Sequence, residues 1–298
     1  MFESPVADGQ LSETAAVADV MPPLENLYLF GLTANDRDRL NAQGLMFGGY
    51  LQDHMPKHLS GFQPRRILDI GCSEGQITRI LAGLYPEAEI IGVDVDPDAI
   101  ARAKAVPMPG HLKRQVEYLV ADANNSLPPG PFDLVHSSLT LMYVRDVPQT
   151  LKLIYDVLSP GGYVWLRESR NEWLVALPHS ATFGRYCAMA SVAALRIGMH
   201  MFLGQELPHL LPGLGFNDVC SLDQSHPIDG TVHGQIAGTV LLGALYNMRK
   251  LIVRMEQLPD ELLLAMHREM VVDSRTSGGS WQLSNVVARK PALYGAGD

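Results

Sequence analysis

Cysteine and basic charge are both scarce in this chain of 298 residues. The three cysteines, Cys72, Cys187 and Cys220, lie far apart and form no CxxC pair, which excludes a disulfide framework and a standard zinc site. We therefore expect no metal. The 23 Lys and Arg residues against 32 Asp and Glu residues give a net charge of −9, and phosphate backbones need a basic surface. The charge balance therefore argues against a nucleic-acid partner.

Long apolar runs are also missing. The N-terminus is acidic and interrupted by prolines, without the basic start and apolar stretch of a secretory signal. The most apolar late stretch, residues 236–246, falls short of the roughly 20 residues that span a bilayer. We interpret it as a buried helix, and we expect a cytoplasmic protein with no membrane partner.

What the chain does have is an ordinary globular composition, 47% hydrophobic and 18% charged, and a regular alternation of elements in its middle. Short apolar runs ending in Gly, Asp or Ser predict strands, and the segments between them have helical periodicity. Predicted strands cover residues 65–71, 89–96, 116–122, 132–138 and 162–169, and predicted helices cover 74–86, 97–106 and 147–162. Strands separated by helices of this length indicate a parallel sheet with helices on both faces.

The flanking segments differ in character. Residues 24–60 have a helical pattern interrupted at Gly48 and Gly49, residues 171–213 are helical and apolar, and residues 231–273 predict two more helices. Strands are predicted at 214–224 and 281–290. We divide the chain into a tail and helical lid (1–60), a Rossmann-like core (61–170), and the rest of the sheet with helical inserts (171–298), which would form a substrate cap and could bury a homodimer interface.

The first predicted strand leads into a turn, Gly71 to Gly75, that precedes a helix. Glycines in such a turn let a ligand lie against the backbone, next to the free N–H groups of the helix. Asp94 ends the second strand, where a carboxylate can accept both hydroxyls of a ribose, and Asp122 ends the third. Asp122 and the Ala123 amide could meet an adenine edge. This pattern predicts a nucleotide-type ligand at the carboxyl ends of the strands.

The spacing of this turn resembles the class I S-adenosylmethionine-dependent methyltransferases, whose first motif reads Asp/Glu-x-Gly-x-Gly-x-Gly. The segment LDIGCSEG matches it, with Ser73 in place of the middle glycine. Residues 132–169, with Pro160-Gly161-Gly162, resemble the fourth and fifth strand region of that family. Residues 210–219 and 281–291 resemble the turn into its sixth strand and its seventh strand. The resemblance extends over about residues 40–225 and the last strand, and it implies an α/β, Rossmann-like, seven-stranded, mostly parallel sheet with an antiparallel last strand.

The resemblance also assigns roles at the cofactor site. It implies S-adenosylmethionine as the cofactor, with Asp94 on the ribose hydroxyls, Val95 on adenine, Asp122 and Ala123 at the adenine edge, and Asp69 steering the methionine amino group. A bacterial small-molecule subgroup further suggests Gln43. The complete set of cofactor candidates is Gln43, Asp69, Gly71, Cys72, Gly75, Asp94, Val95, Asp122, Ala123, Ser137, Ser138 and Leu139. The last three are expected to line the methyl-transfer position.

A general base is needed only when the acceptor is a hydroxyl of high pKa, and histidine is its natural source. The candidates are His136 in the fourth strand and His200 in the insert before the sixth. Tyr143 stands where the subgroup often has histidine. For both histidines, an interpretation as an ordinary core or surface residue is favoured over a catalytic role.

The apolar, methionine-rich segment 183–203 predicts a cap over an apolar acceptor pocket, a buried helix, or both. We therefore expect a methyltransferase of secondary metabolism that acts on a small apolar molecule, with transfer to oxygen slightly favoured. Two alternatives stay open. One is a protein of this fold that binds the cofactor but catalyses a cyclisation or elimination, and the other is a non-catalytic binding subunit. A nicotinamide dehydrogenase is disfavoured by the glycine spacing.

Overall fold

A computed structural model describes residues 34–108, 116–170 and 176–292. Its centre is a seven-stranded sheet in the order β3-β2-β1-β4-β5-β7-β6. The strands are β1 (Arg66–Ile70), β2 (Glu89–Asp94), β3 (Val116–Val120), β4 (Phe132–Ser138), β5 (Leu158–Ser169), β6 (Asn217–Ile228) and β7 (Gly279–Arg289). Strand β7 runs antiparallel to both of its neighbours, and β1 pairs in parallel with β2 and β4. The predicted fold class is confirmed.

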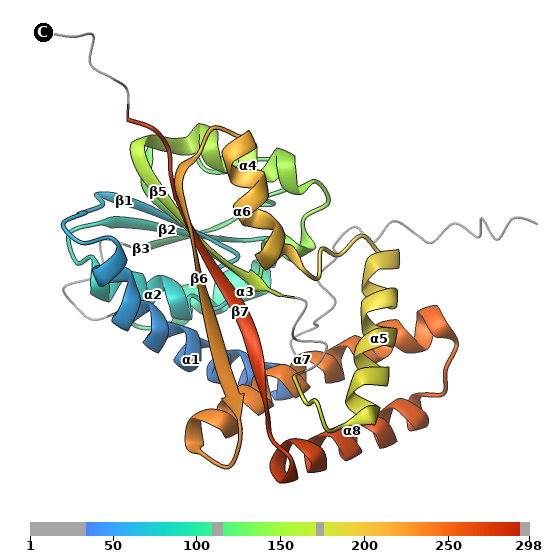
Figure 1. The fold of residues 1–298 in the computed structure, drawn as a ribbon. Helices are drawn as coiled ribbons and strands as arrows, with labels where there is room; N and C mark the ends of the chain where they lie inside the picture. Colours follow the sequence, from blue (N-terminus) through green and yellow to red (C-terminus); the bar gives the residue numbers. More distant parts are fainter. Residues whose placement is uncertain (1–33, 109–115, 171–175, 293–298) are drawn as a thin grey trace, which may run out of the picture.

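Helices cover both faces of this sheet (Figure 1). One face carries α1 (Ala34–His58), α2 (Gln76–Leu84) and α3 (Pro97–Ala105), and the other carries α4 (Val147–Val157) and α6 (Leu203–Gly213). Side-chain caps begin several helices: the Asp96 carboxylate accepts from the Asp98 amide in α3, and the Asp146 carboxylate accepts from the Gln149 amide in α4. Strands β1 and β4 are almost wholly buried, as expected of central strands with both faces covered.

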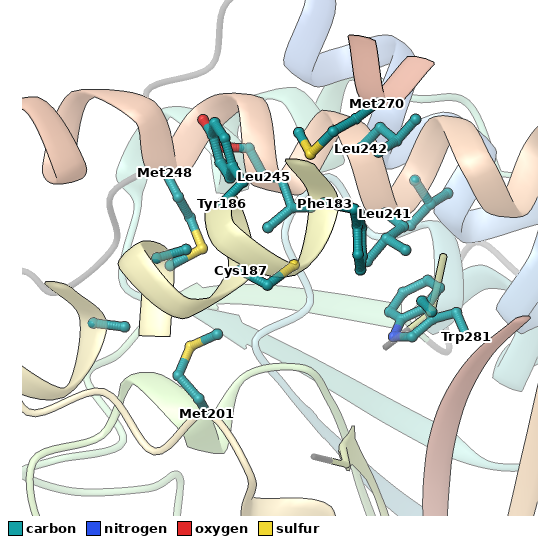
Figure 2. Close-up of a cluster of buried hydrophobic side chains, with 14 of the residues drawn as sticks. Phe183, Tyr186, Cys187, Met201, Leu241, Leu242, Leu245, Met248, Met270 and Trp281 are labelled. Carbon is teal, nitrogen blue, oxygen red and sulfur yellow. The ribbon is translucent and has the colours of Figure 1, made fainter. Parts of the chain in front are cut away.

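A third group of helices lies beyond the carboxyl ends of the parallel strands (Figure 1). It consists of α5 (Ala181–Arg196), α7 (Val232–Glu256) and α8 (Asp260–Thr276), which share an apolar core with α1 and the first half of β7. Figure 2 shows part of this core, in which Phe183, Tyr186 and Cys187 of α5 lie in one cluster with side chains of α7 and α8. The helical inserts therefore cover the edge of the sheet where the predicted ligand site lies.

Helix α7 is the one described helix that is long and apolar enough to cross a membrane. The helix is longer than the apolar stretch at its centre and spans 25 residues. Half of its most apolar window is buried, against α1, α5, α8 and β6. Its apolarity is explained by the core that it forms, which agrees with the interpretation of residues 236–246 as part of a buried helix.

Two boundaries predicted from the sequence are wrong. Gly48 and Gly49 do not interrupt α1, which runs unbroken from Ala34 to His58. A Cβ on Gly48 would overlap the Ile80 side chain, and one on Gly44 would lie 2.7 Å from the Gln76 Oε1 atom, so these glycines allow close packing of α1 on α2. Helix α4 ends at Val157, and Pro160-Gly161-Gly162 belongs to β5.

Candidate cofactor and acceptor site

One cavity connects the carboxyl ends of the parallel strands with the helical inserts. Its first part, which we call the strand-end cleft, is lined by Gly71, Ser73, Asp94, Val95, Asp122, Ala123, Ser138 and Leu139. Its second part, the apolar chamber, is lined by Met142, Met199, Met201, Val240, Leu241, Ala244, Leu245, Met248 and Trp281. Arg39 and Gln43 of α1 lie on the wall as well, and the Arg39 Nη1 atom donates to the Gln43 Oε1 atom at 2.8 Å.

The glycine turn after β1 depends on left-handed backbone. Gly71, Ser73 and Gly75 have φ angles of 73°, 48° and 77°. The amides of Gly71 and Cys72 both donate to the Val93 carbonyl, at 2.8 and 3.0 Å, which fixes the turn against the end of β2. A Cβ at Gly71 would overlap the Thr140 side chain, and one at Gly75 would overlap the Tyr118 ring. Glycine is therefore required at both positions by conformation and by space.

Ser73 adopts the left-handed conformation without being glycine, which costs a residue with a Cβ roughly 1–2 kcal/mol. We expect Ser73→Gly to raise the free energy of unfolding by about 0.5–1 kcal/mol, the strain relieved less the larger backbone entropy of glycine. Urea unfolding measures this change. Ser73→Ala keeps the strain and serves as the control, so a glycine variant no more stable than the alanine variant would contradict the explanation.

Two carboxylates end strands at the cleft, as predicted. The Asp94 Oδ2 atom accepts from the Ser73 amide at 2.8 Å and its Oδ1 atom from the Asp96 amide at 3.0 Å. Burial raises the pKa of Asp94, although these backbone amides act against the rise. The Asp122 carboxylate accepts from the amide and side chain of Asn124 and from the side chain of Asn125. Each carboxylate thus shapes the loop that follows its strand and still faces the cavity.

Several predicted residues lie behind the cavity wall. The Asp69 carboxylate, 2% exposed, accepts from the Thr78 hydroxyl at 2.6 Å and pairs with the His136 Nδ1 atom at 2.7 Å. Asp69 and His136 are register partners on β1 and β4, so this pair joins two central strands. Cys72 and Ser137 are also buried away from the lining, and burial raises the pKa of the Cys72 thiol far above its usual value. Gly75 does not line the cavity either.

The three catalytic candidates are placed differently. Tyr143, in a short 3-10 turn (Leu141–Tyr143), lines the cavity. His136 is fully buried in the sheet, and the structure puts it outside the cavity wall. His200 donates its backbone amide to the Met142 carbonyl at 2.9 Å, but its neighbours Met199 and Met201 line the cavity and its ring does not. The described part of the wall therefore contains no histidine.

Arg39, Trp281 and Glu168 are not among the site residues predicted from the sequence. Arg39 precedes Gln43 by one helical turn, and that spacing on α1 was the signal available for it. Glu168 is fully buried near the end of β5, and its Oε1 atom accepts from the amides of Thr140 and Leu141 at 3.1 and 2.8 Å. It thereby caps the turn that carries Met142 and Tyr143. Its position near a strand end resembles those of Asp94 and Asp122 and could have been noted.

Comparisons with known proteins agree with this geometry. Residues 63–208 match the family model described as a methyltransferase domain. The chain is 37% identical over 99 residues to trans-aconitate 2-methyltransferase of Streptomyces avermitilis, covering 33% of this chain and 37% of that protein. It is 28% identical over 147 residues to the protein of the same name from Methylobacterium radiotolerans, covering 44% of this chain and 54% of that one. The chain thus spans less than two thirds of the curated relatives it matches.

Solved structures resemble the fold over a longer stretch. The [4+2]-cyclase SpnF is 20% identical with a TM-score of 0.52, covering 82% of this chain and 80% of that one. The plantazolicin methyltransferase BpumL, solved in complex with a monoazolic desmethylPZN analogue and SAH, is 15% identical with a TM-score of 0.50, covering 86% of this chain and 88% of that one. At these identities the likeness shows the fold alone. Together with the family model, it confirms the predicted resemblance: residues 63–208 form a methyltransferase domain of the Rossmann-like type.

Proposed function

We propose, from the methyltransferase domain that residues 63–208 form, that this protein moves a methyl group from S-adenosylmethionine to a small, largely apolar acceptor. The observation that carries the proposal is the single cavity in which the strand-end cleft opens into the apolar chamber. A donor held in the cleft and an acceptor held in the chamber would meet where the two join, near Ser138 and Leu139.

The residues of the cleft fit an adenosine-bearing cofactor. Asp94 offers a carboxylate for the ribose hydroxyls, Val95 an apolar contact for the adenine ring, and Asp122 with the Ala123 amide the partners for the adenine edge. Gln43 and Arg39 face the same space from α1. Four other predicted cofactor residues lie behind the cavity wall: Asp69, Cys72, Gly75 and Ser137. They would contribute indirectly, by holding the glycine turn and the end of β4 in place. When bound, S-adenosylmethionine supplies an electrophilic methyl group on its sulfonium.

The chamber supports an apolar acceptor. Methionine and leucine side chains dominate its wall, and Met suits a pocket that adapts to its ligand. Arg39 and Arg145 are the cations on the described part of the cavity wall, whereas a tricarboxylate such as the aconitate named for the relatives would require several. We therefore place the substrate of this chain outside the class that those names indicate.

The acceptor atom is proposed to be an oxygen that ionises readily. No histidine lies on the described wall, and the carboxylates of Asp94 and Asp122 are engaged by amides of their own loops. A phenol or a carboxylic acid needs little help to lose its proton, so alignment and exclusion of water can supply most of the acceleration, on the order of 7–11 kcal/mol in well-oriented systems. The chain contributes the alignment through the chamber wall and the turn of residues 141–143.

Transfer of a tritiated methyl group tests this function. The protein is incubated with labelled S-adenosylmethionine and either a panel of apolar phenols and monocarboxylic acids or aconitate, and label in the organic extract is counted. We expect transfer to members of the apolar panel and none to aconitate. Transfer to aconitate would overturn the assigned acceptor class. Cofactor binding without transfer to any compound would instead favour the non-methylating reaction or the binding subunit.

Replacing Asp94 should weaken the cofactor. We expect Asp94→Ala to cost about 1.5–3 kcal/mol of binding free energy, because charged hydrogen bonds to the ribose are lost. Calorimetric titration with S-adenosylhomocysteine measures this change. Asp96→Ala is the control, because it removes the cap of α3 two residues away and should lower stability without changing affinity. Equal affinity in the Asp94 variant and the wild type would place the ribose elsewhere.

A further inference from the structure

Two buried polar atoms on the described cavity wall have no hydrogen-bond partner. They are the Ser138 Oγ atom, of a residue where the cleft meets the chamber, and the Trp281 Nε1 atom, of a residue that lines the chamber. The Trp281 side chain is only 4% exposed. An indole N–H is a donor and nothing else, and a buried donor left without an acceptor is unfavourable. Trp281 therefore brings an unsatisfied hydrogen-bond donor to the otherwise apolar wall of the chamber.

Neighbouring rings hold Trp281 in place. Its ring centroid lies 6.2 Å from that of Phe47 on α1 and 6.0 Å from that of His226 on β6. Figure 2 shows the Trp281 ring beside Leu241, at the edge of the cluster that Phe183 and Met201 also enter. Because β7 runs antiparallel, its first residues lie at the same edge as the carboxyl ends of the parallel strands. The position of Trp281 near the start of β7 thus places this residue on the chamber wall.

Trp165 provides an internal comparison. It is fully buried on β5, and its Nε1 atom donates to the Asn285 Oδ1 atom at 3.2 Å. The fold therefore supplies a hydrogen-bond acceptor for the indole of Trp165, which lies inside the sheet. It supplies none for the indole of Trp281, which lines the cavity.

We propose that Trp281 determines acceptor specificity by donating a hydrogen bond to an oxygen of the acceptor. This inference rests on the proposed function, because it takes the chamber as the acceptor site. The proposal restricts the acceptor to an apolar molecule with two oxygen atoms in defined positions. One oxygen receives the methyl group, and the other, such as a ketone carbonyl deeper in the chamber, accepts the hydrogen bond from Trp281. A pure hydrocarbon body would leave the indole donor unsatisfied.

The test follows the indole protons by 1H–15N correlation spectroscopy. The chain has three tryptophans, so three indole peaks are expected, and Trp281→Phe identifies the relevant one. The probes are acetophenone and ethylbenzene, which differ in the carbonyl oxygen, titrated with and without S-adenosylhomocysteine. We expect the Trp281 proton to move downfield with the ketone and not with the hydrocarbon. The same movement with both probes, or none with either, would overturn the proposal.

Affinities give a second readout. Trp281→Phe keeps an aromatic ring but removes the donor, so it should weaken the ketone about three- to tenfold and change the hydrocarbon less than twofold. Equal weakening of both would mean that Trp281 only packs. Should this variant fail to fold, Trp165→Phe and Trp173→Phe assign the peak by exclusion. Failure of S-adenosylhomocysteine to bind, with the ketone response intact, would count against the proposed function and not against Trp281.

Discussion

Gly71→Ala should lower the free energy of unfolding by about 2–5 kcal/mol and weaken cofactor binding at least about tenfold. The φ angle of 73° costs a residue with a Cβ roughly 1–2 kcal/mol. The new Cβ would also overlap the Thr140 side chain, and overpacking of this kind costs about 1–3 kcal/mol. Gly71 and Thr140 both line the cavity, so the displacement would reach the proposed cofactor site. Urea unfolding and calorimetric titration measure the two effects.

Two further variants separate the effect of backbone strain on stability from that of steric overlap. Gly71→Ala combined with Thr140→Ala removes the two closest overlaps, with the Thr140 Oγ1 and Cγ2 atoms, but keeps the Cβ contact and the backbone strain. It should therefore recover part of the lost stability beyond the additive expectation. Gly49→Ala is the control, because Gly49 lies in α1 with no atom within 4 Å of an added Cβ. Gly49→Ala should leave the free energy of unfolding unchanged or raise it, since alanine is a better helix former than glycine. A Gly71 variant as stable as the Gly49 variant would contradict the described turn.

Glu168→Gln should change how stability depends on pH. Burial raises the pKa of Glu168 from 4.5 to about 8, although the amides of Leu141, Thr140 and Met142 oppose the rise. Its Oε2 atom is buried without a hydrogen-bond partner. Between pH 4.5 and about 8 the folded chain thus keeps a proton that the unfolded chain has lost, so the stability that Glu168 contributes falls as the pH rises through this window.

Glutamine resembles the protonated carboxyl and still accepts from the turn amides, so the variant should lose this dependence. Relative to Glu168→Gln, the wild type should lose up to about 1.4 kcal/mol per pH unit across the window. Urea unfolding of both proteins from pH 4 to 9 measures the difference between their free energies of unfolding. The contributions of the other titrating groups cancel in this difference, because both proteins contain them. Glu206→Gln on the exposed surface of α6 is the control and should run parallel to the wild type. Parallel curves for Glu168→Gln as well would mean that the carboxyl is ionised in the fold.

The parts of the fold that depend on local sequence were predictable. Strands β1 to β4 are short apolar runs that end at, or within two residues before, a Gly, Asp or Ser. Their parallel arrangement places Gly71, Asp94 and Asp122 at one edge. The strand-end cleft could be predicted for this reason. The predicted homodimer interface and cytoplasmic location stay predictions.

What depends on tertiary contact was not predictable in the same way. Gly48 was predicted to interrupt the helix, whereas Gly48 and Gly44 allow α1 to approach α2, and only the packed structure shows this use. His136 and His200 occupy the expected segments, but the direction of each side chain relative to the cavity depends on the register of β4 and the course of the loop before α6. Trp281 becomes a chamber residue because β7 returns antiparallel beside β5.

Calorimetric titration of the full chain with S-adenosylhomocysteine and, separately, with NAD tests the central claim most directly. The cleft of Gly71, Asp94 and Asp122 predicts saturable binding of the first ligand, weakened in Asp94→Ala, and no binding of NAD. A preference for NAD, or an absence of heat with both ligands in a folded sample, would contradict the claim that this edge of the sheet holds the methyl donor.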